Sequence, residues 1–456
     1  MKQSAGFGKA FLVSSNLDRG RYWRKRPLRE SRYDEMRQLV VYPDCAEQTF
    51  RGFGGAFTEA AGWAWLTLSE NRQEELLEAY FGESGLRYTL GRVHLNSCDF
   101  SLSNYACVES REEYEDGRFS IERDSVYLLP FIRAAGRTAG RPIELLLSPW
   151  SPPAFMKDNG DMNRGGKLLP EYRALWAECL ARYVLEYRRA GCCVRMLSVQ
   201  NEPAASQKWD SCLYTGEEEG RFAAEYLRPA LDRAGLSDVG LLLWDHNKER
   251  LFFRARESMA AAGDGSAAAG FAFHWYAGDH FSALPLVRRA WPEKELWFTE
   301  GCVEYSRRRR ESGADRARRY AHDIIGNLAN GANASIDWNL LLDEKGGPNH
   351  AGNYCEAPVM LDGGSLRRNP SYYAIGHFSR YIRPGAVRLC HSVYDSRLEC
   401  VAFRNPDGSR AAVVLNRSGG RKAVWLTEDG ERGAGFLIPD GALVTLCWGL
   451  PEAETT

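Results

Sequence analysis

The chain has 456 residues, enough for about two or three domains, and a formal net charge of −1 at pH 7. Hydrophobic residues make up 44% and charged residues 26%, the usual balance of a globular protein with a large core. The near-zero net charge argues against nucleic acid or an anionic membrane as a partner.

No targeting or membrane segment is apparent. The apolar run at residues 11–13 is shorter than the roughly 7–15 residues of a secretory signal, and no stretch reaches the roughly 18 of a transmembrane helix. We therefore expect a cytoplasmic protein without a membrane span, although a chain that had already lost a signal would look the same. The twelve cysteines contain no CxxC pair, so we expect reduced thiols and no metal site.

The middle of the chain alternates short apolar runs with helical patterns. The run at residues 143–147 is apolar over most of its length, which is typical of a strand buried on both faces of a parallel sheet. The helical pattern at 67–80 starts with Thr67-Leu-Ser-Glu, which predicts a capping box, and others cover 170–189, 217–231 and 314–330. Eight such repeats predict a (β/α)₈ TIM barrel, of the α/β class, over about residues 50–380. The predicted strands are 52–57, 87–95, 143–148, 195–200, 240–244, 271–275, 296–299 and 335–340.

Both chain ends have the pattern of short antiparallel strands. The N-terminal part contains one at 38–42, and the C-terminal part contains four, at 398–403, 411–415, 423–426 and 442–448. Residues 405–408, Asn-Pro-Asp-Gly, predict a turn between the first two of these four. We therefore expect an attached all-β sandwich formed from both ends. The predicted domains are 1–48 and 385–456 for the sandwich and 49–384 for the catalytic barrel.

Two carboxylates follow predicted barrel strands. Glu202 comes after the fourth strand and Glu300 after the seventh. Active sites of such barrels lie at the C-terminal ends of the strands, so both side chains should share one mouth. A retaining glycosidase needs this pair, because one carboxyl protonates the leaving oxygen while the other attacks the anomeric carbon. The competing interpretation is two structural ion pairs. As an acid, Glu202 needs a raised pKa, which we expect the charge of Glu300 to supply.

Other strand ends carry polar and aromatic side chains suited to a sugar. Asn201 is placed to bind a 2-hydroxyl, Tyr276 to hydrogen-bond the nucleophile, and Asp99 to accept hydrogen bonds from sugar hydroxyls. Trp150 is a candidate for stacking, and Trp338 for the floor of the subsite. Taken singly each aromatic side chain is more typical of a core, but together at one barrel end they indicate a binding site.

The motifs resemble glycoside hydrolase family 30, in its branch of glucosylceramidases and their bacterial relatives, over about residues 45–385. They are Gly52-Phe53-Gly54-Gly55, Ser97-Cys98-Asp99-Phe100-Ser101, Ser148-Pro149-Trp150, Asn201-Glu202-Pro203, His274-Trp275-Tyr276, Glu300-Gly301-Cys302 and Asp337-Trp338-Asn339-Leu340. This resemblance implies a retaining β-glycosidase without cofactor, with a side β-sandwich from both chain ends.

The resemblance also implies individual roles. Glu202 is then the acid/base and Glu300 the nucleophile, with Arg92 near the nucleophile and Asn353 reaching a sugar 6-hydroxyl. The sugar subsite is implied to comprise Asp99, Trp150, Asn201 and Trp338, with Tyr276 beside the nucleophile.

The loop at residues 204–214 departs from the lysosomal members, which leaves the aglycone open. The expected substrate is a small-molecule or oligosaccharide β-glycoside. The first hypothesis for the activity is a β-glucosidase of the glucosylceramidase type. A β-xylosidase and a β-1,6-glucanase are the alternatives within the family, and Asn353 favours a hexose because xylose has no 6-hydroxyl. A non-catalytic carbohydrate-binding protein would have lost a glutamate, and a metal-dependent hydrolase would need a His/Asp cluster that the sequence does not display.

Overall fold

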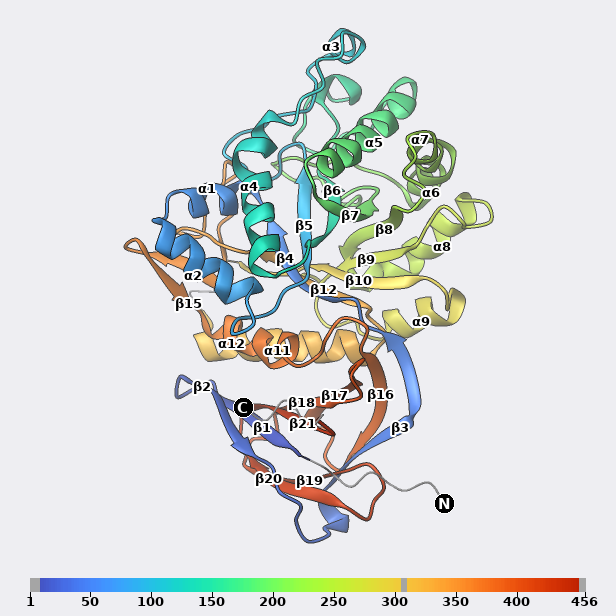
Figure 1. Cartoon of the computed structure of the whole chain (residues 1–456). Coiled ribbons are helices and arrows are strands. Elements are labelled where there is room, and N and C mark those ends of the chain that lie inside the picture. Colours follow the sequence, from blue (N-terminus) through green and yellow to red (C-terminus); the bar gives the residue numbers. More distant parts are fainter. Residues whose placement is uncertain (1–8, 305–309, 451–456) are drawn as a thin grey trace. The chain divides into compact units, whose positions relative to one another are not determined.

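The computed structural model describes residues 9–304 and 310–450 (Figure 1). The chain divides into two compact units. The first consists of the described residues within 53–305 and 335–367, and the second of those within 1–52, 306–334 and 368–456. Among the described residues, no helix is both long and apolar enough to cross a membrane.

A closed barrel of eight strands forms the centre of the first unit, as predicted. The strands are β4 (Gly52–Phe57), β5 (Leu90–Leu95), β6 (Glu144–Pro149), β7 (Cys193–Ser198), β8 (Gly240–Asn247), β9 (Gly270–His274), β10 (Glu295–Glu300) and β12 (Ala334–Asn339). Their order around the barrel is β10-β12-β4-β5-β6-β7-β8-β9. Each lies within a few residues of a predicted run, because strands buried on both faces leave a nearly continuous apolar signal in the sequence.

The glycines of β4 allow its close approach to β5. A Cβ atom on Gly54 would lie 2.2 Å from the carbonyl oxygen of Leu90, so no larger residue fits there without moving backbone. The Gly-rich start of the barrel is therefore a packing requirement.

Helices surround the barrel strands (Figure 1). The prediction of a capping box at Thr67 is wrong: Thr67 closes the preceding helix, with its N–H donating to Trp63 O and Trp65 O, and α2 begins at Glu70. The α-helices of this unit are α1 (Glu59–Leu66), α2 (Glu70–Phe81), α3 (Arg111–Glu115), α4 (Glu122–Thr138), α5 (Arg173–Arg189), α6 (Gly216–Arg221), α7 (Arg228–Arg233), α8 (Leu251–Ala261) and α9 (Ala283–Ala290). A π-helical turn, Phe222–Leu227, joins α6 to α7, and short 3₁₀ turns cover Ala154–Met156, Pro170–Tyr172 and Lys248–Arg250.

The second unit contains the β-sandwich, which is formed by strands from both chain ends, as predicted. Its strands are β1 (Phe11–Asn16), β2 (Arg21–Pro27), β3 (Gln38–Thr49), β16 (Val387–Val393), β17 (Leu398–Arg404), β18 (Arg410–Asn416), β19 (Lys422–Thr427), β20 (Gly433–Ile438) and β21 (Leu443–Trp448). Their order is β2-β1-β21-β18-β17-β16-β3-β19-β20, so N-terminal β1 pairs with β21 and β3 pairs with β16. One apolar cluster, including Leu39, Val414 and Ile438, fills the interior. The predicted turn lies between β17 and β18, with Gly408 at φ +83°.

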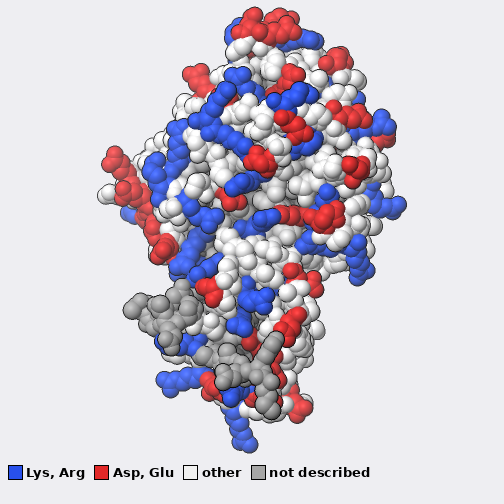
Figure 2. Space-filling view, turned by 45° about the vertical axis from the view of Figure 1, so that its right-hand side comes forward, with Lys and Arg blue, Asp and Glu red and all other residues white. Residues whose placement is uncertain are grey.

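Two helices group with the sandwich, α11 (Gly313–Ala329) and α12 (Pro370–Ser379). His377 on α12 is buried and hydrogen-bonds Thr445 Oγ1 and Ser15 Oγ, both at 2.8 Å, which fixes this helix to β21 and β1. The remaining elements are a 3₁₀ turn, Glu35–Arg37, and two small two-stranded sheets, β11 (Val303–Glu304) with β13 (Cys355–Glu356) and β14 (Val359–Asp362) with β15 (Ser365–Arg368). On the face seen in Figure 2, acidic and basic side chains are interspersed.

Candidate active site

The C-terminal ends of the barrel strands surround a pocket of 180 Å³. All the predicted site residues except Arg92 line it: Asp99, Trp150, Asn201, Glu202, Tyr276, Glu300, Trp338 and Asn353. Residues without a predicted role also line it: Gln207, Trp209, His246, Asn247, Cys302, Glu304 and Cys355. The tertiary structure thus brings together side chains that are separated by more than 250 positions in the sequence.

Glu300 ends β10, and each of its carboxylate oxygens accepts a hydrogen bond. Arg92 Nη1 donates to Oε2 at 2.5 Å, and Tyr276 Oη donates to Oε1 at 2.8 Å. Only 7% of Glu300 is exposed. Two donors, one of them a cation, hold the orientation of this carboxylate.

Arg92 lies behind the pocket, fully buried on β5, and joins the walls of the barrel. Its Nη2 donates to Asn201 Oδ1 at 2.7 Å and to Asp245 Oδ2 at 2.8 Å, and its Nε donates to Ser148 Oγ at 3.1 Å. Burial acts to lower the pKa of the guanidinium, but the charges of Asp245 and Glu300 raise it overall, so Arg92 stays protonated.

Asp245 is the main residue that sequence reasoning missed. It accepts hydrogen bonds from Arg92, from Thr299 Oγ1 at 2.6 Å and from His274 Nε2 at 3.1 Å, and it is fully buried. Burial acts to raise its pKa, but the charge of Arg92 and the bond to His274 hold the pKa well below the ordinary range. The predicted strand stopped at Trp244, whereas β8 continues to Asn247 through a bulge at Asp245, where φ is +45°. In the sequence, the polar run that directly follows this apolar strand was the signal that could have identified Asp245.

Glu202 follows β7 in a left-handed backbone conformation, with φ +46°, and its N–H donates to Asp245 O at 3.0 Å. Non-glycine residues rarely adopt this conformation, and such strain is concentrated at functional sites. Glu202 Oε1 lies 3.2 Å from His274 Nδ1 and 3.4 Å from His246 Nδ1. The acid candidate therefore sits between two imidazole rings.

The expectation of a raised pKa for Glu202 is wrong. Burial does act to raise it, but His246 and His274 outweigh burial and hold the pKa well below its usual range. His274 responds in the opposite sense: burial lowers its pKa, but the charge of Glu300 and the hydrogen bonds to Asp245 and Glu202 raise it to about 9. The proton of this pair therefore resides on His274, next to an ionised Glu202.

The other side of the pocket combines a carboxyl group with aromatic rings. Asn353 Nδ2 donates to Asp99 Oδ2 at 3.0 Å. Burial, followed by the charge of Glu300, raises the pKa of Asp99 to about 8. Trp150 and Trp338 stack with ring centroids 5.3 Å apart and are 2% and 3% exposed, so both are part of the barrel packing and of the pocket wall.

A pair of thiols lies beside the Glu300 carboxylate. Cys302 Sγ is 3.1 Å from Cys355 Sγ and 3.4 Å from Tyr276 Oη. Burial and the contact with Cys355 raise the pKa of Cys302, so the thiol is protonated. Cys302 was noted in the sequence, whereas Cys355 was not.

The loop at residues 204–214 is anchored by Asp210. Its carboxylate accepts hydrogen bonds from Ser97 Oγ at 2.5 Å and Asn104 Nδ2 at 2.8 Å, and lies 3.1 Å from His350 Nε2. The adjacent Trp209 lines the pocket and packs against the apolar cluster around it. This loop, which follows Glu202 in the sequence, therefore forms part of the pocket wall.

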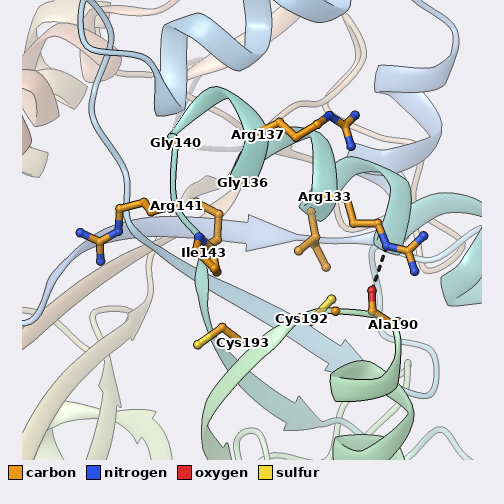
Figure 3. A pocket seen from close by; sticks show the side chains of 12 residues that line it. Arg133, Gly136, Arg137, Gly140, Arg141, Ile143, Ala190, Cys192 and Cys193 are labelled. Carbon is orange, nitrogen blue, oxygen red and sulfur yellow. Dashed lines mark hydrogen bonds between the residues drawn. The ribbon is translucent and has the colours of Figure 1, made fainter.

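A larger cavity of 520 Å³ lies between the C-terminal ends of α4 and α5 (Figure 3). Its lining includes no predicted site residue. The guanidinium groups of Arg133, Arg137 and Arg141 point in different directions (Figure 3), so they do not converge on one ligand position. The pocket at the strand ends remains the candidate active site.

An eight-stranded barrel with two differently held carboxylates among aromatic rings defines a glycoside hydrolase. The model of the glycosyl hydrolase family 30 TIM-barrel domain matches residues 50–382, and that of the family's β-sandwich domain matches 385–446. The chain belongs to this family.

Relatives within the family carry different activities in their names. The lysosomal acid glucosylceramidase of Mus musculus is 33% identical over 401 residues, which cover 83% of this chain and 77% of that protein. Among solved structures, SrfJ from Salmonella typhimurium is 44% identical with a TM-score of 0.94, covering 97% of this chain and all of SrfJ. The endo-β1,6-glucanase BT3312 is 26% identical with a TM-score of 0.87, covering 97% of this chain and all of that one.

Proposed function

We propose that this protein is a retaining, exo-acting β-glucosidase of the glucosylceramidase type. The observation that supports it best is the contrast between the two carboxyl groups. Glu300 is clamped by Arg92 and Tyr276, whereas Glu202 lies against two imidazoles that can supply and take a proton. Different environments for two carboxyls in one site assign different chemical roles to them.

In the proposed reaction, Glu300 attacks the anomeric carbon while Glu202 protonates the leaving oxygen. The attacking carboxylate is held in position by its two donors, and the proton for Glu202 is available from His274 Nδ1, 3.2 Å away. Loss of the aglycone leaves a covalent glycosyl-enzyme on Glu300. Glu202, now ionised again, removes a proton from water, which attacks the same carbon and releases the sugar with its original β configuration.

The glycone assignment rests on the pocket. A volume of 180 Å³ is below the roughly 300–1,000 Å³ of sites for larger ligands and suits a single sugar ring. The Asn353–Asp99 pair offers a donor and an acceptor for hydroxyl groups, consistent with a hexose that retains its 6-hydroxyl. The similarity to glucosylceramidases supports glucose as that hexose.

Trapping with a 2-deoxy-2-fluoro-β-glucoside bearing a good leaving group tests the proposal. We expect stoichiometric inactivation and a mass increase of one fluoroglucosyl group on the peptide that contains Glu300. Product analysis by NMR should show β-glucose first. Labelling of another residue, or α-glucose as the first product, would contradict the retaining mechanism with Glu300 as nucleophile.

A second candidate is a β-1,6-glucanase, which the similarity to BT3312 over 97% of this chain favours. A panel of aryl β-glucoside, aryl β-xyloside and β-1,6-linked glucan separates the possibilities. Cleavage of the glucoside with release of single glucose units supports the exo-glucosidase. Internal cleavage of the glucan identifies the glucanase, and cleavage of the xyloside alone identifies a β-xylosidase.

A further inference from the structure

Glu202, His246 and His274 form a cluster of three possible metal ligands in the pocket wall. They come from the end of β7, from β8 and from the end of β9, and one oxygen or nitrogen atom of each lies within 4.8 Å of the other two. The ligand set of two imidazoles and one carboxylate is one that catalytic zinc sites use.

The two distances from Glu202 to the imidazoles match those between neighbouring ligands of a tetrahedrally coordinated ion. With bonds of about 2.0–2.2 Å to nitrogen and oxygen, two ligands of tetrahedral zinc lie about 3.3 Å apart. Glu202 Oε1 is 3.2 Å from His274 Nδ1 and 3.4 Å from His246 Nδ1. The third separation, between the two imidazoles, is within 4.8 Å, so an ion between these atoms needs at most a modest approach of the two rings.

The orientation of the two imidazoles supports the same interpretation. His246 Nδ1 is buried and points its lone pair or proton to no partner other than Glu202 Oε1, 3.4 Å away, among the described residues. His274 uses Nε2 for Asp245, at 3.1 Å, which leaves Nδ1 for the cluster. A ligating histidine whose second nitrogen is held by a carboxylate is the usual arrangement in metal sites.

The charge around the cluster also favours a dication. Once His274 has released its proton, the carboxyl groups of Glu202, Glu300 and Asp245 face one permanent cation, Arg92. Because Glu202 and His246 also line the pocket, the fourth coordination position is open to water.

We propose that Glu202, His246 and His274 bind Zn²⁺, or a similar divalent transition metal ion, and that the bound ion blocks the pocket. The ion takes the lone pairs of both imidazoles and of the Glu202 carboxylate, and the proton on His274 is released to water. Binding of the ion is independent of the proposed function, whereas the resulting inhibition rests on Glu202 acting as acid/base.

Calorimetric titration of the metal-free full chain with zinc chloride tests the binding. A Cys45→Ser/Cys390→Ser background removes a second, exposed cluster formed by Cys45, Glu47 and Cys390. In that background we expect one equivalent of Zn²⁺, with affinity reduced at least about tenfold by His246→Asn and by Glu202→Gln. Glu300→Gln is the matched control, because it removes a pocket carboxylate that is not a ligand and should leave the stoichiometry at one.

Two further measurements complete the test. Co²⁺ in place of Zn²⁺ should give the visible absorption of a four-coordinate ion in the background and in Glu300→Gln, but not in His246→Asn, provided that circular dichroism shows the variants folded. Zn²⁺ should inhibit turnover reversibly, with recovery on adding a chelator. Absence of binding in the background, or binding unchanged in both His246→Asn and Glu202→Gln, overturns the proposal. Binding that disappears only with Cys355→Val assigns the ion to the thiol pair and also overturns it.

Discussion

The carboxylate of Glu300 and the guanidinium of Arg92 form a buried ion pair, with Oε2 and Nη1 2.5 Å apart. The same guanidinium contacts Asp245 on β8 and Asn201 after β7, so one side chain on β5 connects several strands of the barrel. A buried cation of this kind is stable only while its partners are in place, because each unpaired charge in the interior is costly.

Replacing Arg92 with lysine should therefore impair both stability and activity. A lysine ammonium has three donors on a single nitrogen and cannot reach Glu300, Asp245 and Ser148 together. We expect destabilisation of about 3–5 kcal/mol and a loss of at least about 100-fold in kcat/KM. Thermal melting and steady-state kinetics measure the two effects. Arg111→Lys, at an exposed ion pair with Glu115, is the control and should change neither.

Tyr276→Phe removes one donor from the Glu300 carboxylate while keeping the ring. A hydrogen bond to a charged group contributes about 1.5–3 kcal/mol, so kcat/KM should fall about 10–150-fold with little change in melting temperature. Kinetics on an aryl β-glucoside test this. An unchanged kcat/KM would show that the 2.8 Å contact with Glu300 has no role in turnover.

Asp99→Asn should stabilise the protein in a pH-dependent way. The pKa of Asp99 is raised to about 8 in the folded protein from 3.8 as an ordinary aspartate. Below pH 3.8 the Asp99 carboxyl is protonated in both the folded and the unfolded protein, so it does not reduce the free energy of unfolding. As pH rises through this window the unfolded state ionises first, so stability is progressively lost until the folded pKa is reached.

The melting temperature of Asp99→Asn should therefore exceed that of the wild type by a margin that increases from about pH 5 to pH 8. At the upper end, the free energy of unfolding of the variant should be higher by on the order of a few kcal/mol. Thermal melts across this range measure it. A difference that is constant with pH would contradict a raised pKa for Asp99.

Trp209→Ala should affect the aglycone more than the glycone. Trp209 lines the pocket on the loop that follows Glu202, and we expect the aglycone on this side because Glu202 is the proposed acid. We expect KM to rise about tenfold for a glucoside with a long alkyl aglycone, equivalent to about 1.4 kcal/mol, and much less for a small aryl glucoside. Lys208→Ala, at the exposed neighbouring residue, is the matched control. Equal effects on both substrates would place Trp209 in the glycone subsite.

The barrel and sandwich were predictable because their signals are local. Buried strands such as β4 and β6 leave apolar runs, and the turn at 405–408 contains the residues that such a turn requires. The helix start at Thr67 was mispredicted because the capping pattern begins at the end of α1, and a sequence pattern alone does not distinguish a helix end from a helix start.

The sequence by itself determined that Glu300 ends one barrel strand and that Glu202 follows another, so that both lie at the same end of the barrel, since each position follows from its own apolar run. Only the tertiary structure decided what surrounds them. Asp245 enters the site through a bulge that extends β8, and His246 and His274 approach Glu202 from two other strands. The pKa of a buried carboxyl depends on which charges lie within a few ångströms, and that proximity is created by barrel closure rather than by any local pattern.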